Sequence, residues 1–337
     1  MSYEINILNI IDFLRNHDSL ITQNTLKWKQ NRKFIVGSSE ISALLGENFF
    51  KSRWQLMEEK IYSKPYTFQL PCSWGKMFEP VMEIITELEY GTEIFGNNSC
   101  IFGEQFGYPG IINSPDGYCV LKFFYHPITE KYVLPTRTFL QEVDSDDFVF
   151  APVVLEFKSP FSRDITKKPP KYYLPQIWTG ITLCPLVLCG LFIEGVFRLC
   201  EEADWHNTNY MNIQRDKEPF LNVIGRGYFY VYSSDTEIDL NDLNESSLSD
   251  LMQKSKIKLG YFKLNDVDDE FHRAPRDGNM KGKLFFKLYK INFLPIAPNS
   301  GYLSSIQPEI TRFIEEVQER TNTVNPLQPN AQLSQHR

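Results

Sequence analysis

Two short segments, each at a predicted β-strand, carry acidic residues forty positions apart. They constrain what this chain can fold into more than any other feature. The first contains Pro-Asp-Gly around Asp116, which predicts a turn between two strands. The second is the run Val-Val-Leu-Glu-Phe-Lys that ends at Lys158, which predicts a strand. Because side chains alternate between the two faces of a strand, Glu156 and Lys158 point to one side and Phe157 points into the core.

This arrangement predicts a site for a divalent metal ion. If the turn and the strand are neighbours, the carboxylates of Asp116 and Glu156 meet and offer the hard oxygen ligands that Mg²⁺ prefers. The backbone carbonyl of Phe157 is placed to add a further ligand. Lys158 beside the ion would orient a water molecule and make hydroxide available near neutral pH. The alternative is an ordinary turn and a solvated Glu-x-Lys ion pair, each of which is common on its own.

Further segments occur in a fixed order along the chain. Trp-Gly-Lys-Met-Phe-Glu opens a long helix and ends at Glu79. Ser-Pro-Phe continues the strand of Glu156, and Tyr-Tyr-Leu-Pro-Gln ends at Gln176 on the next helix. Towards the N-terminus, Gly-Ser-Ser-Glu places Ser38 and Ser39 at the start of a short helix, for which either serine is a good N-cap.

Taken together, these segments resemble the PD-(D/E)XK nucleases of the lambda exonuclease type, also called YqaJ-like viral recombinases. The resemblance covers roughly residues 26–195 in the order of the family pattern. The chain departs from that pattern conservatively, with Phe157 in place of Leu and Ser159 in place of Cys. The stretch between Asp116 and Glu156 is longer than in the family, and a hairpin insertion at about 121–147 explains the difference.

The resemblance implies a role for each matched residue at the metal site. Asp116 and Glu156 would bind two Mg²⁺ ions, for which Mn²⁺ would substitute, with help from the carbonyl of Phe157. Lys158 would act on the attacking water. Glu79 would complete or orient the site, in part through water. The alternative for Glu79 is a purely structural one, as a partner of buried backbone groups.

The resemblance also implies a receptor for the end of a DNA strand. Arg32 and Ser39, with Ser38 beside it, match positions that hold a terminal 5′-phosphate, and Gln176 would reach the site from its helix. An arginine fork and a helix N-terminus are both natural phosphate receptors. The alternatives stay open: Arg32 lies in a lysine-rich segment and could contact the DNA backbone generically, the serines could be caps alone, and Gln176 could pair with buried backbone.

The resemblance implies an α/β (α+β) fold with a restriction-endonuclease-like core, in which a central mixed β-sheet is flanked by helices. Runs of Val, Ile, Phe and Tyr predict later strands at Tyr228–Tyr232, Leu259–Leu264 and Leu284–Phe293. We expect an N-terminal helix in residues 1–25, the nuclease core in 26–200, a β-rich extension packed on the core in 201–321, and a disordered tail in 322–337.

The charge pattern agrees with a DNA substrate although the net charge is −7. Residues 26–76 contain nine Lys or Arg against four Asp or Glu, and residues 158–171 contain five against one. Both segments contain or flank the site motifs. A basic groove on an acidic body suits an enzyme that must bind phosphates and still move along DNA.

We therefore expect a Mg²⁺-dependent deoxyribonuclease, a 5′-to-3′ exonuclease on duplex DNA ends, used in viral or phage recombination, repair or genome processing. The partners implied are double-stranded DNA with free ends, a single-strand annealing protein and further copies of the chain in a homo-oligomer. The alternatives are an endonuclease or a DNA/RNA nuclease on the same core, and a catalytically inactive DNA-binding protein. Three intact charged residues at the site argue against inactivity.

Nothing in the sequence predicts secretion or a membrane span. The N-terminal segment lacks a basic region ahead of an apolar one. The apolar stretch at residues 177–193 contains Pro185 and is shorter than the roughly 20 apolar residues of a span. The six cysteines form no Cys-x-x-Cys pair, which favours reduced thiols. We expect an intracellular protein, in the cytoplasm or nucleus of an infected host cell.

Overall fold

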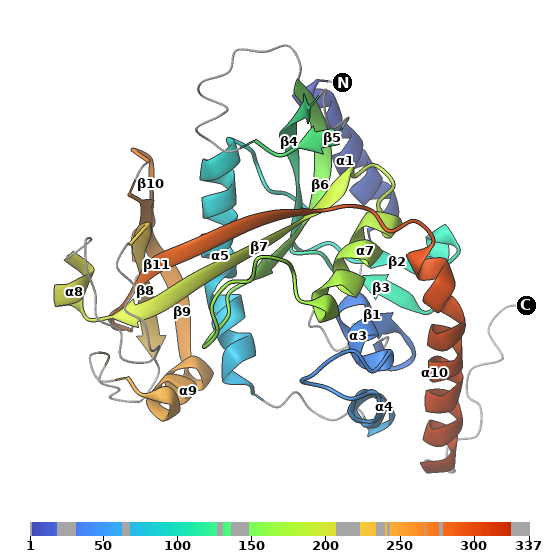
Figure 1. Ribbon diagram of the computed structural model, residues 1–337. Helices are drawn as coiled ribbons and strands as arrows, with labels where there is room; N and C mark the ends of the chain where they lie inside the picture. Colours follow the sequence, from blue (N-terminus) through green and yellow to red (C-terminus); the bar gives the residue numbers. More distant parts are fainter. Residues whose placement is uncertain are drawn as a thin grey trace, which may run out of the picture.

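A long curled β-sheet and the helices that cover it make up the mixed α/β fold of this protein (Figure 1). The computed structural model describes residues 2–18, 32–62, 68–126, 131–135, 148–206, 223–233, 240, 243–265, 267–275 and 279–324. Among these residues, eight strands form the large sheet in the order β10-β9-β8-β11-β7-β6-β4-β5. The strands are β4 (Gly117–His126), β5 (Lys131–Val133), β6 (Phe148–Lys158), β7 (Cys189–Cys200), β8 (Gly225–Ser233), β9 (Ser255–Leu264), β10 (Glu270–His272) and β11 (Met280–Ile296).

The parallel pair of β6 and β7 lies in the interior of the large sheet. Residues 151–157 of β6 and residues 189–198 of β7 are buried without interruption. Such continuous apolar runs are typical of strands covered on both faces. On its other side β6 pairs with the antiparallel β4, and β7 pairs with the antiparallel β11 over Gly190–Cys200. The predicted catalytic strand therefore lies in the middle of the sheet.

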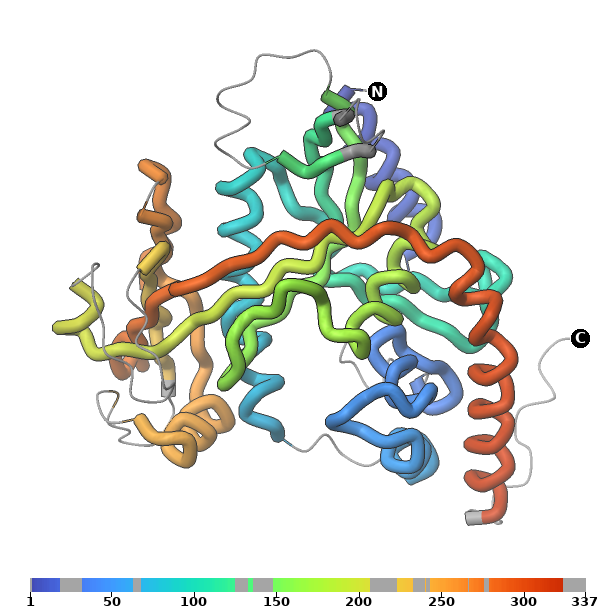
Figure 2. The backbone as a smooth tube through the Cα atoms, viewed as in Figure 1, coloured from blue at the N-terminus to red at the C-terminus, as the bar shows by residue number. Residues whose placement is uncertain are grey.

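The β-rich region expected at 201–321 joins the core sheet directly. Its three predicted strands are present as β8, β9 and β11, and β11 hydrogen-bonds to β7 of the core. The long strands β7 and β11 run side by side across the molecule in Figure 2. The two parts of the chain consequently share one sheet.

Helix α5 (Leu70–Tyr90) lies in the concave side of the curled sheet. Its buried residues Trp74, Phe78, Val81 and Ile85 recur every three or four positions, so they form one apolar face of the helix. They pack on side chains of β6, β7, β8 and β11, where Phe78 stacks on Phe197 with ring centroids 4.2 Å apart. This packing holds the helix that carries Glu79 against the sheet.

The remaining elements build the opposite wall of the site. A small sheet in the order β1-β3-β2 joins strands β1 (Val36–Gly37), β2 (Ile101–Phe102) and β3 (Ile111–Asn113). Around it lie the short helices η1 (Arg32–Phe34), η2 (Ser38–Glu40), α3 (Ile41–Leu44), η3 (Gly103–Phe106) and η4 (Lys171–Tyr173), and the helices α1 (Tyr3–His17), α4 (Arg53–Tyr62), α7 (Leu174–Leu183) and α10 (Tyr302–Val324). Helices α8 (Glu202–His206) and α9 (Glu245–Lys254) belong to the C-terminal part.

Two expectations differ from the structure or lie beyond it. The tail was expected to begin at residue 322, but α10 continues to Val324. The apolar face of α10 packs on α4 and α7 up to Val317, and the last turns extend the helix from there. The rest of the tail, and residues 136–147 of the expected insertion, lie outside the described residues. No helix in the described ranges is long and apolar enough to cross a membrane.

Candidate active site

The register between β4 and β6 brings the two predicted metal ligands together. Gly117 pairs with Leu155, so Asp116, which precedes β4, lies beside Glu156. The backbone N–H of Phe157 donates a hydrogen bond of 2.6 Å to Oδ2 of Asp116. The turn is thereby tied to the strand, and the predicted neighbourhood of Asp116 and Glu156 is present in the structure.

Glu156 and Lys158 point to the same side of β6 and form an ion pair. Only 3% of Glu156 is exposed, while the Nζ of Lys158 lies 5.0 Å from the ring centre of Tyr173. Burial, together with the nearby Asp116, raises the pKa of Glu156 to about 8 despite the attraction of Lys158. Burial opposes the charge on Lys158, but Glu156 and Asp116 raise the pKa of the amine above its ordinary value, so Lys158 is an ammonium.

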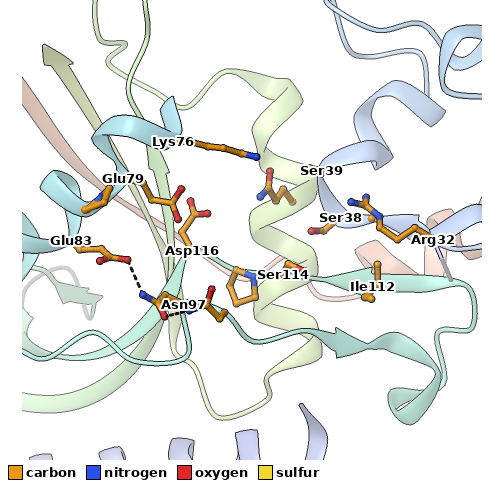
Figure 3. A pocket seen from close by; sticks show the side chains of 15 residues that line it. Arg32, Ser38, Ser39, Lys76, Glu79, Glu83, Asn97, Ile112, Ser114 and Asp116 are labelled. Carbon is orange, nitrogen blue, oxygen red and sulfur yellow. Dashed lines mark hydrogen bonds between the residues drawn. The ribbon is translucent and has the colours of Figure 1, made fainter. Parts of the chain in front are cut away.

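Helix α5 brings Glu79 to the same carboxylates. Burial and the charges of Asp116 and Glu83 raise the pKa of Glu79 to about 7. Burial also raises the pKa of Asp116. Glu79 and Asp116 point into the same end of the pocket in Figure 3. Carboxylates that repel one another in this way are a natural receptor for a divalent cation, which replaces their protons.

The donor set fits Mg²⁺ in its chemistry because all three side chains offer oxygen. In the part of the chain that the structure describes, no three His, Cys, Asp or Glu side chains already surround a common point that could hold a metal ion. Glu156 is instead ion-paired with Lys158. Metal binding would require that Glu156 exchange this partner.

A pocket of about 600 Å³ extends from these carboxylates to Arg32 (Figure 3). Gln176 lines it, as predicted, from the first turn of α7, and it also borders a small adjoining void with Glu156. Glu156 and Lys158 are not among the residues that line the main pocket. The pocket is lined by Arg32, Gly37, Ser38, Ser39, Lys76, Glu79, Pro80, Glu83, Asn97, Asn98, Ile112, Ser114, Pro115, Asp116 and Gln176.

The far end of the pocket holds Arg32 in a defined position. Its Nη2 lies 3.0 Å from Oε1 of Glu40. The guanidinium also packs so closely on Gly37 that a Cβ at residue 37 would clash with Nη2. Any larger residue there would therefore displace the arginine. Neither Gly37 nor Glu40 was predicted as a site residue.

Ser38 and Ser39 line the pocket beside Arg32, but neither is a helix cap. They lie inside η2, whose N-cap is Gly37, and Glu40 is the N-cap of α3. The expectation that one serine caps the helix was therefore wrong. The backbone turns one residue earlier than expected because the N–H of Gly37 is bound by the carboxylate of Glu40, at 2.7 Å. Both serines line the same pocket as Arg32.

Lys60 on α4 holds the carboxylate of Glu40 in place by hydrogen bonding. Its Nζ donates to Oε2 of Glu40 at 2.7 Å and to the carbonyls of Arg32 and Ile35 at 3.0 and 2.7 Å. Burial alone would raise the pKa of Glu40, but Lys60 and Arg32 lower it to about 2. Burial lowers the pKa of Lys60 below its ordinary value. The three groups carry two positive charges and one negative charge, which leaves one positive charge directed at the pocket.

We expect Lys60→Met to lower the free energy of unfolding by about 3 kcal/mol, because it leaves Glu40 buried beside one cation only. Lys51→Met removes a lysine from an exposed pair with Glu59 and should cost less than about 1 kcal/mol. Urea unfolding of both variants measures the difference. Because the pKa of Glu40 is lowered on folding, the contribution of the pair is complete above pH 4.5 and is lost as the pH falls towards 2. Equal losses in the two variants at pH 7 would contradict this assignment.

Other pocket residues were missed from the sequence. Lys76 and Glu83 lie one turn before and after Glu79 on α5, so helical spacing would have found them. Asn97 donates to Glu83 at 3.0 Å, and it comes from a loop that only the fold brings to this helix. No local pattern marked the asparagine.

Residues 27–182 match the family described as the YqaJ-like viral recombinase domain. This span contains every residue predicted for the site, from Arg32 to Gln176. This part of the chain is similar to the YqaJ-like viral recombinase domain. The resemblance stated from the sequence is confirmed.

The chain is also similar to viral proteins that match over nearly their whole length. Protein D345L of the African swine fever virus isolate Tick/Malawi/Lil 20-1/1983 is 28% identical over 328 residues, which cover 94% of this chain and 92% of the viral protein. Protein D345L of the Badajoz 1971 Vero-adapted strain is 28% identical over 326 residues, with the same coverage. The similarity therefore extends well beyond the matched domain.

A solved structure is similar over most of both chains. The alkaline exonuclease (LHK-Exo) from Laribacter hongkongensis is 12% identical, with a TM-score of 0.43, and the alignment covers 90% of this chain and 97% of that one. The structure of LHK-Exo in complex with dAMP is 13% identical, with the same TM-score and coverage.

Proposed function

We propose that this protein is a metal-dependent exodeoxyribonuclease that digests duplex DNA from a 5′ end in viral recombination, repair or genome processing. One observation carries the proposal: a single pocket has acidic side chains, Glu79 and Asp116, at one end and a positively charged Arg32 at the other. Such a pocket suits a DNA strand whose terminal phosphate and next phosphodiester must be held at two separate points. The similarity of residues 27–182 to a viral recombinase family supports DNA as the substrate.

The acidic end would hold the metal. Asp116, Glu156 and the carbonyl of Phe157 are the proposed ligands, with Glu79 as a further ligand or as one that acts through water. We propose two Mg²⁺ ions, for which Mn²⁺ substitutes because it accepts the same oxygen ligands. When bound, the ions supply Lewis acidity and a water molecule of lowered pKa.

The side chains of this protein would then orient the reactants. Lys158 carries a positive charge, and if Glu156 served as a metal ligand, Lys158 would donate to the attacking water or to a phosphate oxygen. Gln176, at the start of α7, can hydrogen-bond the nucleotide at the scissile bond from the opposite wall. Each of these groups comes from a regular element of the fold, which keeps the geometry rigid.

The basic end would anchor the terminal phosphate. The guanidinium of Arg32, held by Glu40, lines the pocket, and Ser38 and Ser39 line it as well. A phosphate bound there would place the following phosphodiester towards the carboxylates. The proposed enzyme therefore needs a free DNA end.

Digestion of matched DNA substrates tests the proposal. Linear duplexes with a 5′-phosphate should be degraded in Mg²⁺, those with a 5′-hydroxyl more slowly, and covalently closed circles not at all. Cutting of the circle would favour an endonuclease, and degradation of an RNA duplex would favour a nuclease of broader substrate range. Tight DNA binding without cleavage in any metal would identify an inactive DNA-binding protein. The single strand left by digestion would be the substrate of an annealing protein, and light scattering would show whether the enzyme is a homo-oligomer.

We expect Ca²⁺ to occupy the acidic site and support little cleavage. Its longer and looser coordination positions water and phosphate poorly compared with Mg²⁺. Thermal unfolding should show stabilisation by both ions, and a cleavage assay should show product with Mg²⁺ or Mn²⁺ alone. Rapid digestion in Ca²⁺ would refute this expectation.

A further inference from the structure

Two adjacent phenylalanines stand in solvent on the loop between α3 and α4. Phe49 is 89% exposed and Phe50 is 78% exposed, more than any other large hydrophobic residue among those that the structure describes. Burial of one such ring stabilises a protein by about 1.5–3 kcal/mol. Two neighbouring exposed rings therefore forgo a large stabilisation of the folded chain. Contiguous exposed apolar groups generally mark a binding surface.

The loop is held in this conformation by its own hydrogen bonds. Oδ1 of Asn48 accepts from the N–H groups of Phe50 and Lys51 at 2.8 and 3.2 Å, and Nδ2 of Asn48 donates to Ser42 at 3.1 Å. On the other side, Ser52 begins α4 with a reciprocal pair of bonds to Gln55 at 2.8 and 3.2 Å. A loop anchored at both ends presents its rings without a large entropic cost on binding.

The rings lie close to the catalytic strand. Phe49 and Phe50 meet Tyr172 edge to face, with centroids 6.3 and 5.7 Å apart. Tyr172 in turn contacts Tyr173 at 4.3 Å, and Tyr173 lies next to the amine of Lys158. A continuous row of aromatic side chains thus leads from the catalytic lysine to the exposed loop, which in the view of Figure 2 turns towards the lower end of α5.

The charges around this row favour a polyanion as the partner. Lys167, Lys168 and Lys171 are exposed on the segment that leads from β6 to Tyr172, and the acidic residue of that segment, Asp164, is paired with Lys290. Lysine is depleted at protein–protein interfaces, whereas aromatic rings flanked by lysines are characteristic of proteins that bind single-stranded nucleic acid. Flat base faces are accessible only where bases are unpaired or at a duplex end.

We propose that Phe49 and Phe50, supported by Tyr172, form a platform on which an unpaired base of the DNA stacks next to the active site. The proposal rests on the proposed function for the identity of the substrate as DNA. It adds a contact to the base, which neither the metal site nor the phosphate receptor makes. The platform would hold frayed or single-stranded nucleotides with little regard to sequence, because every base offers a π-face.

Binding to two matched DNA ends tests the platform without cleavage. Both are 5′-phosphorylated duplexes with two unpaired terminal nucleotides, but in one the two bases are absent and only the backbone remains. In Ca²⁺, fluorescence anisotropy should show that the protein binds the base-bearing end about tenfold more tightly for each stacked base. The double variant Phe49→Ala/Phe50→Ala should bind both ends with the same affinity, while Phe49→Tyr/Phe50→Tyr should retain the preference.

A matched control separates the platform from a general loss of exposed apolar surface. Leu8→Ala on α1 removes a side chain that is 59% exposed, and it should leave the preference unchanged. If the double alanine variant keeps the full preference, or if the parent shows none while it digests DNA, the platform is refuted and the nuclease proposal stands. If the parent neither binds nor digests DNA, both fail. A change of oligomeric state in the double variant, with no change in base preference, would make the loop a contact between copies.

Discussion

Replacement of Asp116, Glu156 or Lys158 should reduce Mg²⁺-dependent digestion by about a thousandfold or more. These three groups would hold the metal ions and the attacking water, whose stabilisation of the transition state is the largest contribution in such chemistry. The variants Asp116→Asn, Glu156→Gln and Lys158→Met preserve side-chain size. In particular, Asp116→Asn keeps an oxygen for the N–H of Phe157. Single-turnover digestion of a 5′-phosphorylated duplex measures the effect.

Two controls show that the loss is chemical. Thermal unfolding without metal should change little for Asp116→Asn, whereas the stabilisation by added Mg²⁺ should disappear with the ligand. Glu59→Gln removes the charge of a carboxylate whose side chain is 43% exposed on α4, and it should digest DNA at the parent rate. If Lys158→Met digests DNA as fast as the parent, the site is assigned wrongly.

Arg32→Ala should abolish the preference for 5′-phosphorylated ends and leave metal binding nearly unchanged. A charge-assisted bidentate contact is worth about 1.5–3 kcal/mol, so efficiency on such ends should fall roughly ten- to a hundredfold. Arg32→Lys should recover only part of the loss, because an ammonium keeps the charge but not the planar fork. Comparison of rates on ends that carry a phosphate or a hydroxyl gives the result directly.

The close packing of Arg32 on Gly37 provides a second route to the same test. Gly37→Ala introduces a methyl group where Nη2 of Arg32 now lies, so it should resemble Arg32→Ala although the arginine is present. Gly75→Ala is the matched control, because a Cβ at residue 75 meets no atom within 4 Å. If the parent itself degrades both kinds of end equally, Arg32 is an ordinary backbone contact.

Local patterns were sufficient to predict the acidic half of the site. The alternation of side chains along a strand predicted that Glu156 and Lys158 point to the same side. The Pro-Asp-Gly turn predicted that Asp116 lies at the end of a neighbouring strand. The long helix predicted to carry Glu79 is also present, as α5. These predictions depend only on residues that are close together in the sequence or that lie on adjacent strands.

The contacts that hold Arg32 in place at the basic end of the pocket are not encoded in any local sequence pattern. Lys60 lies 28 residues from Arg32, and it meets the carbonyl of that residue only after α4 has packed on η1. Its sequence context is that of an exposed helical lysine, and only the fold buries it to 6% exposure. No sequence pattern singled out Phe49 and Phe50 either. Their exposure follows from the hydrogen bonds of Asn48, which turn the loop outward.

The shared strands β7 and β11 have a consequence for where this protein can be divided. The matched family domain ends at residue 182, before β7 begins, yet β7 pairs over Gly190–Cys200 with β11, which begins only at Met280. A fragment that stops at residue 200 would leave the N–H and C=O groups along one edge of β7 without their partners, and an open edge of that length invites aggregation. The boundary of the family domain is therefore not a boundary of cooperative folding, and the smallest active fragment should need the C-terminal half as well.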